Sequence, residues 1–178
     1  MRPLLLAALA VLLAAPAEAV EPPDGFRQPP YRGRTPDHAP GAVTVETEAV
    51  MRLRRAGAVL IDVTPLTLGT YGALKDRWIE TAPHETLPDA HWLPNVGLAA
   101  PPPAVEAWFR ATLEALTGGD RSRPLVFFCQ ADCWMSWNAA RRAALWGYAA
   151  VHWYRDDLDA WRLSLEPMPP GRPRPFAP

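Results

Sequence analysis

Both cysteines of the chain lie in one short segment, Cys129-Gln-Ala-Asp-Cys-Trp-Met-Ser136. The segment follows an apolar run, residues 125–128, and precedes an alanine-rich pattern that is typical of a helix. A strand, a loop and a helix in this order place a sulfur atom at a helix N-terminus, where the dipole and free N–H groups favour a thiolate. The sequence therefore predicts two catalytic cysteines, Cys129 and Cys133, in an active-site loop with Gln130, Ala131, Asp132, Trp134, Met135 and Ser136.

The spacing of the two cysteines limits how they can interact. On a regular helix, residues four apart have Cβ atoms about 5–6 Å apart, whereas a disulfide requires about 3.5–4.5 Å. A bridge between Cys129 and Cys133 therefore requires a non-helical loop. Three interpretations stay open: a reactive pair in which Cys129 is the nucleophile and Cys133 the resolving thiol, a static disulfide, or two inert buried thiols. The carboxylate of Asp132 is expected to raise the pKa of Cys129.

Metal binding is a further interpretation of the two sulfurs. Two thiolates suit Cu(I) or half of a zinc site, and zinc requires two more ligands. The four histidines are scattered along the sequence, with His84 the first candidate for a ligand. The pattern predicts no metal site and no cofactor.

The N-terminal sequence indicates where this chemistry takes place. Arg2, a short apolar run and the small residues around Ala19 predict a secretory signal peptide over residues 1–19. Export to the periplasm places the thiols in an oxidising compartment. The formal net charge of −1 and the pI of about 6.4 favour neither nucleic acid nor an acidic membrane surface as a partner.

Apolar runs alternate with helical patterns between two proline-rich segments. Residues 20–42 form a proline-rich N-terminal arm, residues 43–163 one domain, and residues 164–178 a proline-rich C-terminal tail. Strands are expected at 42–45, 58–63, 91–94, 125–128 and 150–153, and helices at 46–56, from 103 to about 117, at 136–146 and at 156–163. Residues 64–90 are expected to hold only short local structure. The alternation predicts an α/β fold, a parallel sheet with helices on both faces, with Cys129 at a carboxyl end of a strand.

Several motifs in this order resemble those of rhodanese-like domains. The motifs are Ala58-Val-Leu-Ile-Asp-Val63, His91-Trp-Leu-Pro-Asn-Val96, Pro124-Leu-Val-Phe-Phe-Cys129, Ser136-Trp-Asn-Ala-Ala140 and Gly147-Tyr-Ala-Ala-Val151. More narrowly, the segment from Cys129 to Ala140 resembles the CxxxCW-motif family associated with catabolism that depends on pyrroloquinoline quinone (PQQ). The resemblance implies supporting roles for Asp62 and His91, and persulfide chemistry at Cys129.

The chain departs from the rhodanese pattern at two positions. Met135 stands where the loop usually has an arginine, and the loop is one residue longer than in common sulfurtransferases. Related phosphatases and arsenate reductases need that arginine to bind an oxyanion, so these activities are disfavoured. Thr64 also replaces an arginine that follows the Asp-Val pair, so Asp62 is expected to find another partner, such as N–H groups of the cysteine loop.

Two function classes follow from these observations. The first is a periplasmic rhodanese-like sulfurtransferase or thiol–disulfide oxidoreductase, accessory to PQQ-dependent alcohol oxidation and acting with a periplasmic redox partner or dehydrogenase system. The alternative is a non-enzymatic accessory protein that binds a redox cofactor, copper or a partner protein. Among nearby residues, Trp137 is expected in the core, Trp134 either shields the sulfurs or contacts a partner, and Arg141 and Arg142 are expected to face solvent.

Overall fold

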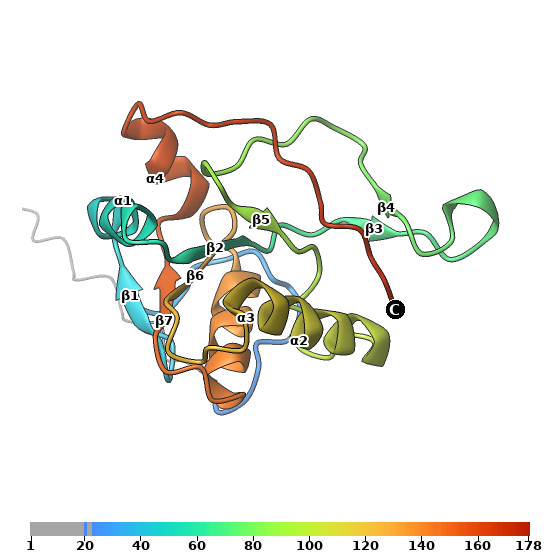
Figure 1. Cartoon of the computed structure of the whole chain (residues 1–178), viewed down its shortest axis with the longest axis horizontal. Helices are drawn as coiled ribbons and strands as arrows, with labels where there is room; N and C mark the ends of the chain where they lie inside the picture. Colours follow the sequence, from blue (N-terminus) through green and yellow to red (C-terminus); the bar gives the residue numbers. More distant parts are fainter. Residues whose placement is uncertain (1–19, 21–22) are drawn as a thin grey trace, which may run out of the picture.

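A five-stranded parallel sheet forms the centre of the molecule, with strand order β1-β7-β6-β2-β5 (Figure 1). The computed structural model describes residue 20 and residues 23–178, so the predicted signal peptide lies outside the described residues. The strands are β1 (Val43–Val45), β2 (Val59–Asp62), β5 (His91–Trp92), β6 (Leu125–Phe128) and β7 (Val151–Tyr154). Every residue of β2 and β6 is buried, as central strands of a parallel sheet require.

Helices cover both faces of this sheet, which confirms the predicted α/β class. The helices are α1 (Thr47–Arg55), α2 (Pro103–Thr117), α3 (Trp134–Leu145) and α4 (Asp157–Leu163). Helices α2 and α3 bury their apolar residues in one core cluster, while α1 and α4 contribute to a second cluster with Leu60, Val126 and Phe128. In Figure 1, α1 and α4 lie on one side of the strands and α2 and α3 on the other.

Sequence signals explain where the helices beside the site begin and end. Pro103 is the first residue of α2, where its missing N–H costs nothing, and Gly118 ends the helix in the left-handed conformation with φ of 66°. Helix α3 begins two residues before the predicted start at Ser136. One prediction for α3 is wrong: Arg142 is only 4% exposed and donates hydrogen bonds to the carbonyls of Val96, Leu98 and Ala99.

The long segment between β2 and β5 contains a small antiparallel hairpin. Strands β3 (Thr67–Leu68) and β4 (Trp78–Ile79) pair with each other and are connected through a 3-10 turn, η1 (Gly72–Leu74). The hairpin projects from the body of the molecule, at the right of Figure 1. This agrees with the prediction of only short local structure at residues 64–90.

Both proline-rich segments lie against the domain. The tail, residues 164–178, covers the edge of the sheet at β5, where Pro173 is bridged to Trp92 and the N–H of Arg174 donates to the Trp92 carbonyl at 2.9 Å. Phe176 packs edge-on against Trp78 and Trp108. The tail thus occupies a strand edge that would otherwise present unpaired backbone groups.

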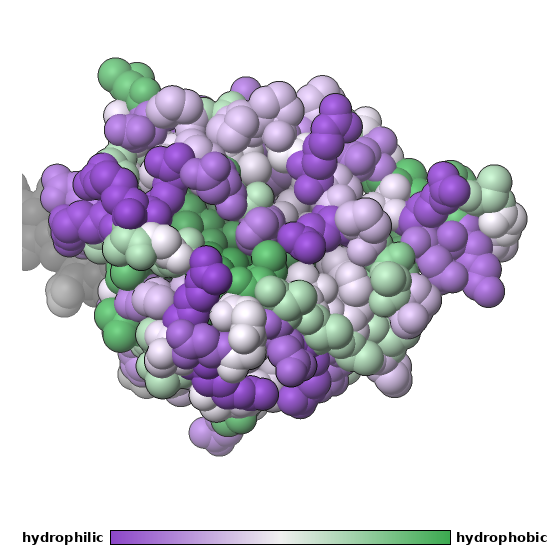
Figure 2. All heavy atoms as spheres, in the orientation of Figure 1, coloured by the Kyte–Doolittle hydropathy of each residue, from purple (hydrophilic) through white to green (hydrophobic). Residues whose placement is uncertain are grey.

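Hydrophilic residues dominate the face of the molecule in Figure 2, and hydrophobic residues gather near its centre and at isolated points of the rim. Across residue 20 and residues 23–178, no helix has the length and apolar character needed to cross a membrane.

Candidate thiol–disulfide site

Cys129 directly follows β6, at the carboxyl end of a central strand. Its backbone is held by the start of α4: the Cys129 N–H donates to Asp157 Oδ1 at 2.9 Å, and the Leu158 N–H donates to the Cys129 carbonyl at 3.2 Å. Asp157 is 1% exposed and has a positive φ of 58°. The sheet and α4 together therefore fix the position of the first cysteine.

The segment from Cys129 to Cys133 is not helical, which is the geometry that a bridge requires. Asp132 has a positive φ of 56°, and Cys133 is the extended N-cap of α3, with φ of −106° and ψ of 110°. The two Sγ atoms lie 2.7 Å apart, and both thiols are free. A disulfide bond is about 2.05 Å long, so only a small movement of either side chain joins the sulfurs.

The two thiols differ in acidity. Burial is the main cause that raises the pKa of Cys129, and its hydrogen bond to Cys133 and the charges of Cys133, Asp157 and Asp62 add to it. The same hydrogen bond, donated by the Cys129 thiol, lowers the pKa of Cys133. The Met135 and Ser136 N–H groups and the Arg32 charge lower it further, although neither N–H completes a capping hydrogen bond to the sulfur. Negative charge on the pair therefore resides on Cys133.

This asymmetry was not anticipated from the sequence, which favoured Cys129 as the nucleophile. The carboxylates that act on Cys129 are Asp157 and Asp62, after the larger effect of burial, and not Asp132. Asp132 is exposed on the loop. Asp157 could have been noticed in the sequence only as an acidic residue at a helix start, because its contact with Cys129 spans two elements.

Asp62 has other partners than the expected N–H groups of the cysteine loop. Its Oδ1 accepts from the Thr64 N–H at 2.9 Å, and its Oδ2 lies 2.7 Å from both His84 Nε2 and Thr86 Oγ1. Thr64 places its hydroxyl 3.8 Å from the Cys129 sulfur. The fully buried Asp62 and the partly buried His84 therefore form a hydrogen-bonded pair beside the site.

The start of α3 anchors the loop in the core. Ser136 is fully buried; its hydroxyl donates to the Cys133 carbonyl at 3.1 Å and accepts from Trp153 Nε1 at 3.0 Å. Trp134, Met135 and Trp137 are also buried, so Trp137 lies in the core as predicted, and the Trp134 ring packs edge-on against that of Trp137. Gln130 and Asp132 are exposed and Ala131 is partly exposed, so this part of the loop faces solvent.

The N-terminal arm contributes a residue that the sequence did not identify. The Trp134 N–H donates to the Tyr31 carbonyl at 2.8 Å, and the Gly33 N–H donates to the Asp132 carbonyl at 2.9 Å. Arg32, between these bonds, is bridged to Cys133 and places its Nη1 3.1 Å from Gln130 Oε1. It supplies positive charge to the loop, which lowers the pKa of Cys133. The only hint in the sequence was the abundance of arginine in the arm.

His91 is not brought to the cysteines by any contact in the described structure. It lies on β5 opposite Ile61 of β2, lines a surface cavity with Val59 and Arg54, and has its Nδ1 3.4 Å from Arg174 Nη1. Burial, then the charge of Arg174, lowers its pKa. Among residue 20 and residues 23–178, no three or more histidine, cysteine and acidic side chains are grouped as metal ligands.

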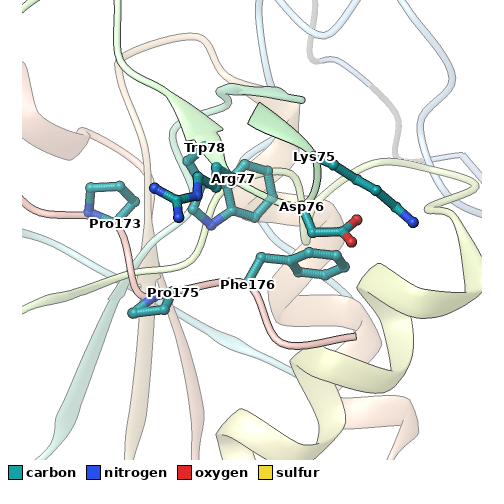
Figure 3. Close-up of a pocket in the computed structure, with 7 residues that line it drawn as sticks. All are labelled: Lys75, Asp76, Arg77, Trp78, Pro173, Pro175 and Phe176. Atoms are coloured by element: carbon teal, nitrogen blue, oxygen red, sulfur yellow. The ribbon is translucent and has the colours of Figure 1, made fainter. Parts of the chain in front are cut away.

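Two surface cavities are each large enough to hold a ligand, and only one of them adjoins the site. One, of about 510 Å³, adjoins the cysteine loop and is lined by Arg32, Pro83, His84, Glu85, Gln130, Leu158, Asp159 and Arg162. The other, of about 440 Å³, lies between the β3–β4 hairpin and the tail and contains no loop residue. Figure 3 shows the rings of Trp78 and Phe176 in this second cavity, with Lys75, Asp76 and Arg77 around them.

Comparison with known proteins assigns no family to this arrangement. No protein-family model matches the chain, and no curated protein matches it.

Proposed function

We propose that the protein is a thiol–disulfide oxidoreductase, rhodanese-like in its arrangement, whose Cys129–Cys133 pair cycles between dithiol and disulfide. The observation that carries the proposal is the 2.7 Å separation of two free sulfurs in a non-helical loop. The opposite pKa directions of the two thiols support different roles for them in such a cycle.

The reaction assigns different roles to the two sulfurs. The Cys133 thiolate attacks one sulfur of a partner disulfide, forming a mixed disulfide and releasing the first partner thiolate. Cys129 then loses its proton and attacks the Cys133 sulfur, which releases the second partner thiolate and leaves the Cys129–Cys133 disulfide. Two electrons pass to the partner disulfide, which is reduced as the pair is oxidised. The proton of Cys129 passes to the first partner thiolate, and because burial raises the pKa of Cys129, this second attack is expected to be the slower of the two.

Intact mass with alkylation tests this proposal. After mild oxidation, the wild-type protein is expected to lose about 2 Da, the two hydrogens of a disulfide, and to resist alkylation until it is reduced. Cys129→Ser is expected to trap a mixed disulfide on Cys133, whereas Cys133→Ser traps less because Cys129 is the weaker thiolate. A wild-type protein that is alkylated at both thiols after oxidation contradicts the proposal.

Sulfur transfer is a second candidate, supported by the resemblance and by the position of Cys129 after a central strand. In this reaction Cys129 attacks the sulfane sulfur of thiosulfate, sulfite leaves, and cyanide removes the persulfide sulfur as thiocyanate. Met135 in place of the loop arginine weakens binding of a dianion, unless Arg32 supplies that charge. Thiocyanate formation that is lost in Cys129→Ser supports this candidate.

The cavity between the hairpin and the tail favours a non-enzymatic alternative, the binding of an aromatic anion. Its lining combines the Trp78 and Phe176 rings with two cations, Lys75 and Arg77, and one carboxylate, Asp76. Because the resemblance connects the chain with PQQ-dependent catabolism, PQQ is the ligand to test, by quenching of tryptophan fluorescence. Saturable quenching in the wild-type protein that is lost in Lys75→Ala/Arg77→Ala supports binding; quenching that is equal in both proteins does not.

A further inference from the structure

The segment Tyr31–Gly33 pairs with the cysteine loop as a short antiparallel strand would. Its two backbone hydrogen bonds, Trp134 N–H to Tyr31 carbonyl and Gly33 N–H to Asp132 carbonyl, are 2.8 and 2.9 Å long. They lie on either side of the bridge between Arg32 and Cys133. This segment lies over a reactive thiol that is only 3% exposed.

The pattern of these bonds fixes the distance between the paired residues. Because the bonds flank Arg32 and Cys133 and do not join them, the two form a non-hydrogen-bonded pair, for which Cα atoms are about 4.5 Å apart. Disulfides form at Cα separations of about 4.4–6.8 Å. A cysteine in the position of Arg32 is therefore within bonding reach of Cys133.

We propose that Tyr31–Gly33 occupies the docking site of an extended polypeptide partner, whose cysteine replaces Arg32 opposite Cys133. This inference rests on the proposed thiol–disulfide function and specifies its substrate class. The partner cysteine is the sulfur attacked by the Cys133 thiolate, and it leaves as a thiolate when Cys129 attacks Cys133. The arm acts as an internal competitor that covers the sulfurs until the partner displaces it.

The backbone groups of the cysteine loop that bind the arm favour a polypeptide over a small thiol as the partner. The Trp134 N–H and the Asp132 carbonyl are a donor and an acceptor at strand spacing, and a peptide backbone satisfies both at once. Arg32 is exposed, and the described structure gives its side chain one hydrogen bond, to the exposed Gln130. The cavity of about 510 Å³ continues from Arg32 and Gln130, which leaves room for flanking residues of the partner.

An engineered disulfide tests the geometry in the full-length chain. In a Cys129→Ala background, Arg32→Cys is expected to form a disulfide between the introduced thiol and Cys133 in nearly all molecules. Arg34→Cys in the same background is the matched control, because Arg34 is also an exposed arm residue but is not bridged to Cys133. Equal disulfide formation with Cys133 in the two variants, or no disulfide in Arg32→Cys, overturns the proposed docking position.

A peptide probe tests the substrate class. The probe has the sequence of residues 27–36 with cysteine in place of Arg32, activated as a disulfide with thionitrobenzoate, and its reaction with Cys133 in Cys129→Ala releases a coloured thiolate. Methylation of the backbone nitrogen at the probe position that corresponds to Gly33 removes the hydrogen bond to the Asp132 carbonyl. This change is expected to slow the reaction about tenfold. Equal rates for the two peptides contradict docking. If the engineered disulfide and the peptide rates are as expected but Cys129 and Cys133 of the wild-type protein form no disulfide, the proposed thiol–disulfide function is contradicted and the docking site is not.

Discussion

Two neighbouring thiols of opposite pKa shift define the site at the scale of residues. The sequence identified both cysteines, their loop and the need for a non-helical backbone, because these depend on local spacing. It did not identify which sulfur carries the charge. That property depends first on the burial of Cys129 and on the hydrogen bond between the two sulfurs. Asp157 and Arg32 add to it, and they approach from about 28 and 100 residues away in the chain.

Arg32 is expected to promote the thiolate of Cys133. Arg32→Gln removes its charge and should raise the pKa of Cys133, lowering the rate of alkylation near neutral pH by roughly threefold to tenfold through a smaller thiolate fraction. The measurement is the pH dependence of the alkylation rate in Cys129→Ala. Arg34→Gln is the control, and a shift of the profile that is equal in both variants contradicts a specific role for Arg32.

Asp157 is expected to make stability depend on pH. Burial is the largest of the effects that raise the pKa of Asp157 above that of an unfolded aspartate. The protonated carboxyl therefore contributes its full stabilisation below pH 3.8, and this contribution is lost as the pH rises through the pKa of the folded protein. Asp157→Asn retains an acceptor for the Cys129 N–H. It should therefore be more stable than wild type at neutral pH, by about 1–3 kcal/mol, and gain no advantage at pH 3. Urea unfolding of both proteins at the two pH values measures this difference. A stability difference between wild type and Asp157→Asn that is the same at both pH values contradicts the prediction.

At the scale of elements, the periodic segments were predictable and the proline-rich ones were not. Strand β6 has the predicted bounds, and β2 and α1 differ from prediction by about one residue at each end, because apolar periodicity determines them. The N-terminal arm pairs with the cysteine loop through backbone groups of Tyr31 and Gly33, which leave no periodic signal in the sequence. Arg142 was misassigned for a similar reason, since its partners are carbonyls of a distant loop.

Close packing of a glycine sets the position of α3. A Cβ on Gly97 would overlap the Met135 carbonyl in the first turn of the helix, so Gly97→Ala should lower the free energy of unfolding by about 1–3 kcal/mol. Displacement of that turn should also slow disulfide formation. Gly25→Ala is the matched control because its Cβ would meet no atom within 4 Å. Thermal unfolding of both variants is the measurement, and equal midpoints contradict the packing argument.

At the scale of the whole molecule, the redox state of the pair should set stability. A disulfide between Cys129 and Cys133 closes a five-residue loop, for which the chain-entropy relation gives about 2 kcal/mol of stabilisation. The structure already holds the sulfurs close together, so little strain opposes this gain. Denaturant unfolding of the oxidised and reduced forms should differ by this amount, whereas Cys133→Ser should be unaffected by the oxidant. An oxidised form that is less stable than the reduced form contradicts a preformed site.

The most direct test of a reversible dithiol–disulfide pair is equilibration of the wild-type protein in glutathione buffers of graded ratio. The fraction of disulfide is quantified by alkylation after acid quench. A single two-electron transition is expected, with a tenfold change in the oxidised-to-reduced ratio of the protein for each change of about 30 mV in buffer potential. Independent glutathionylation of the two thiols, or no transition over the range of buffers, would contradict the account.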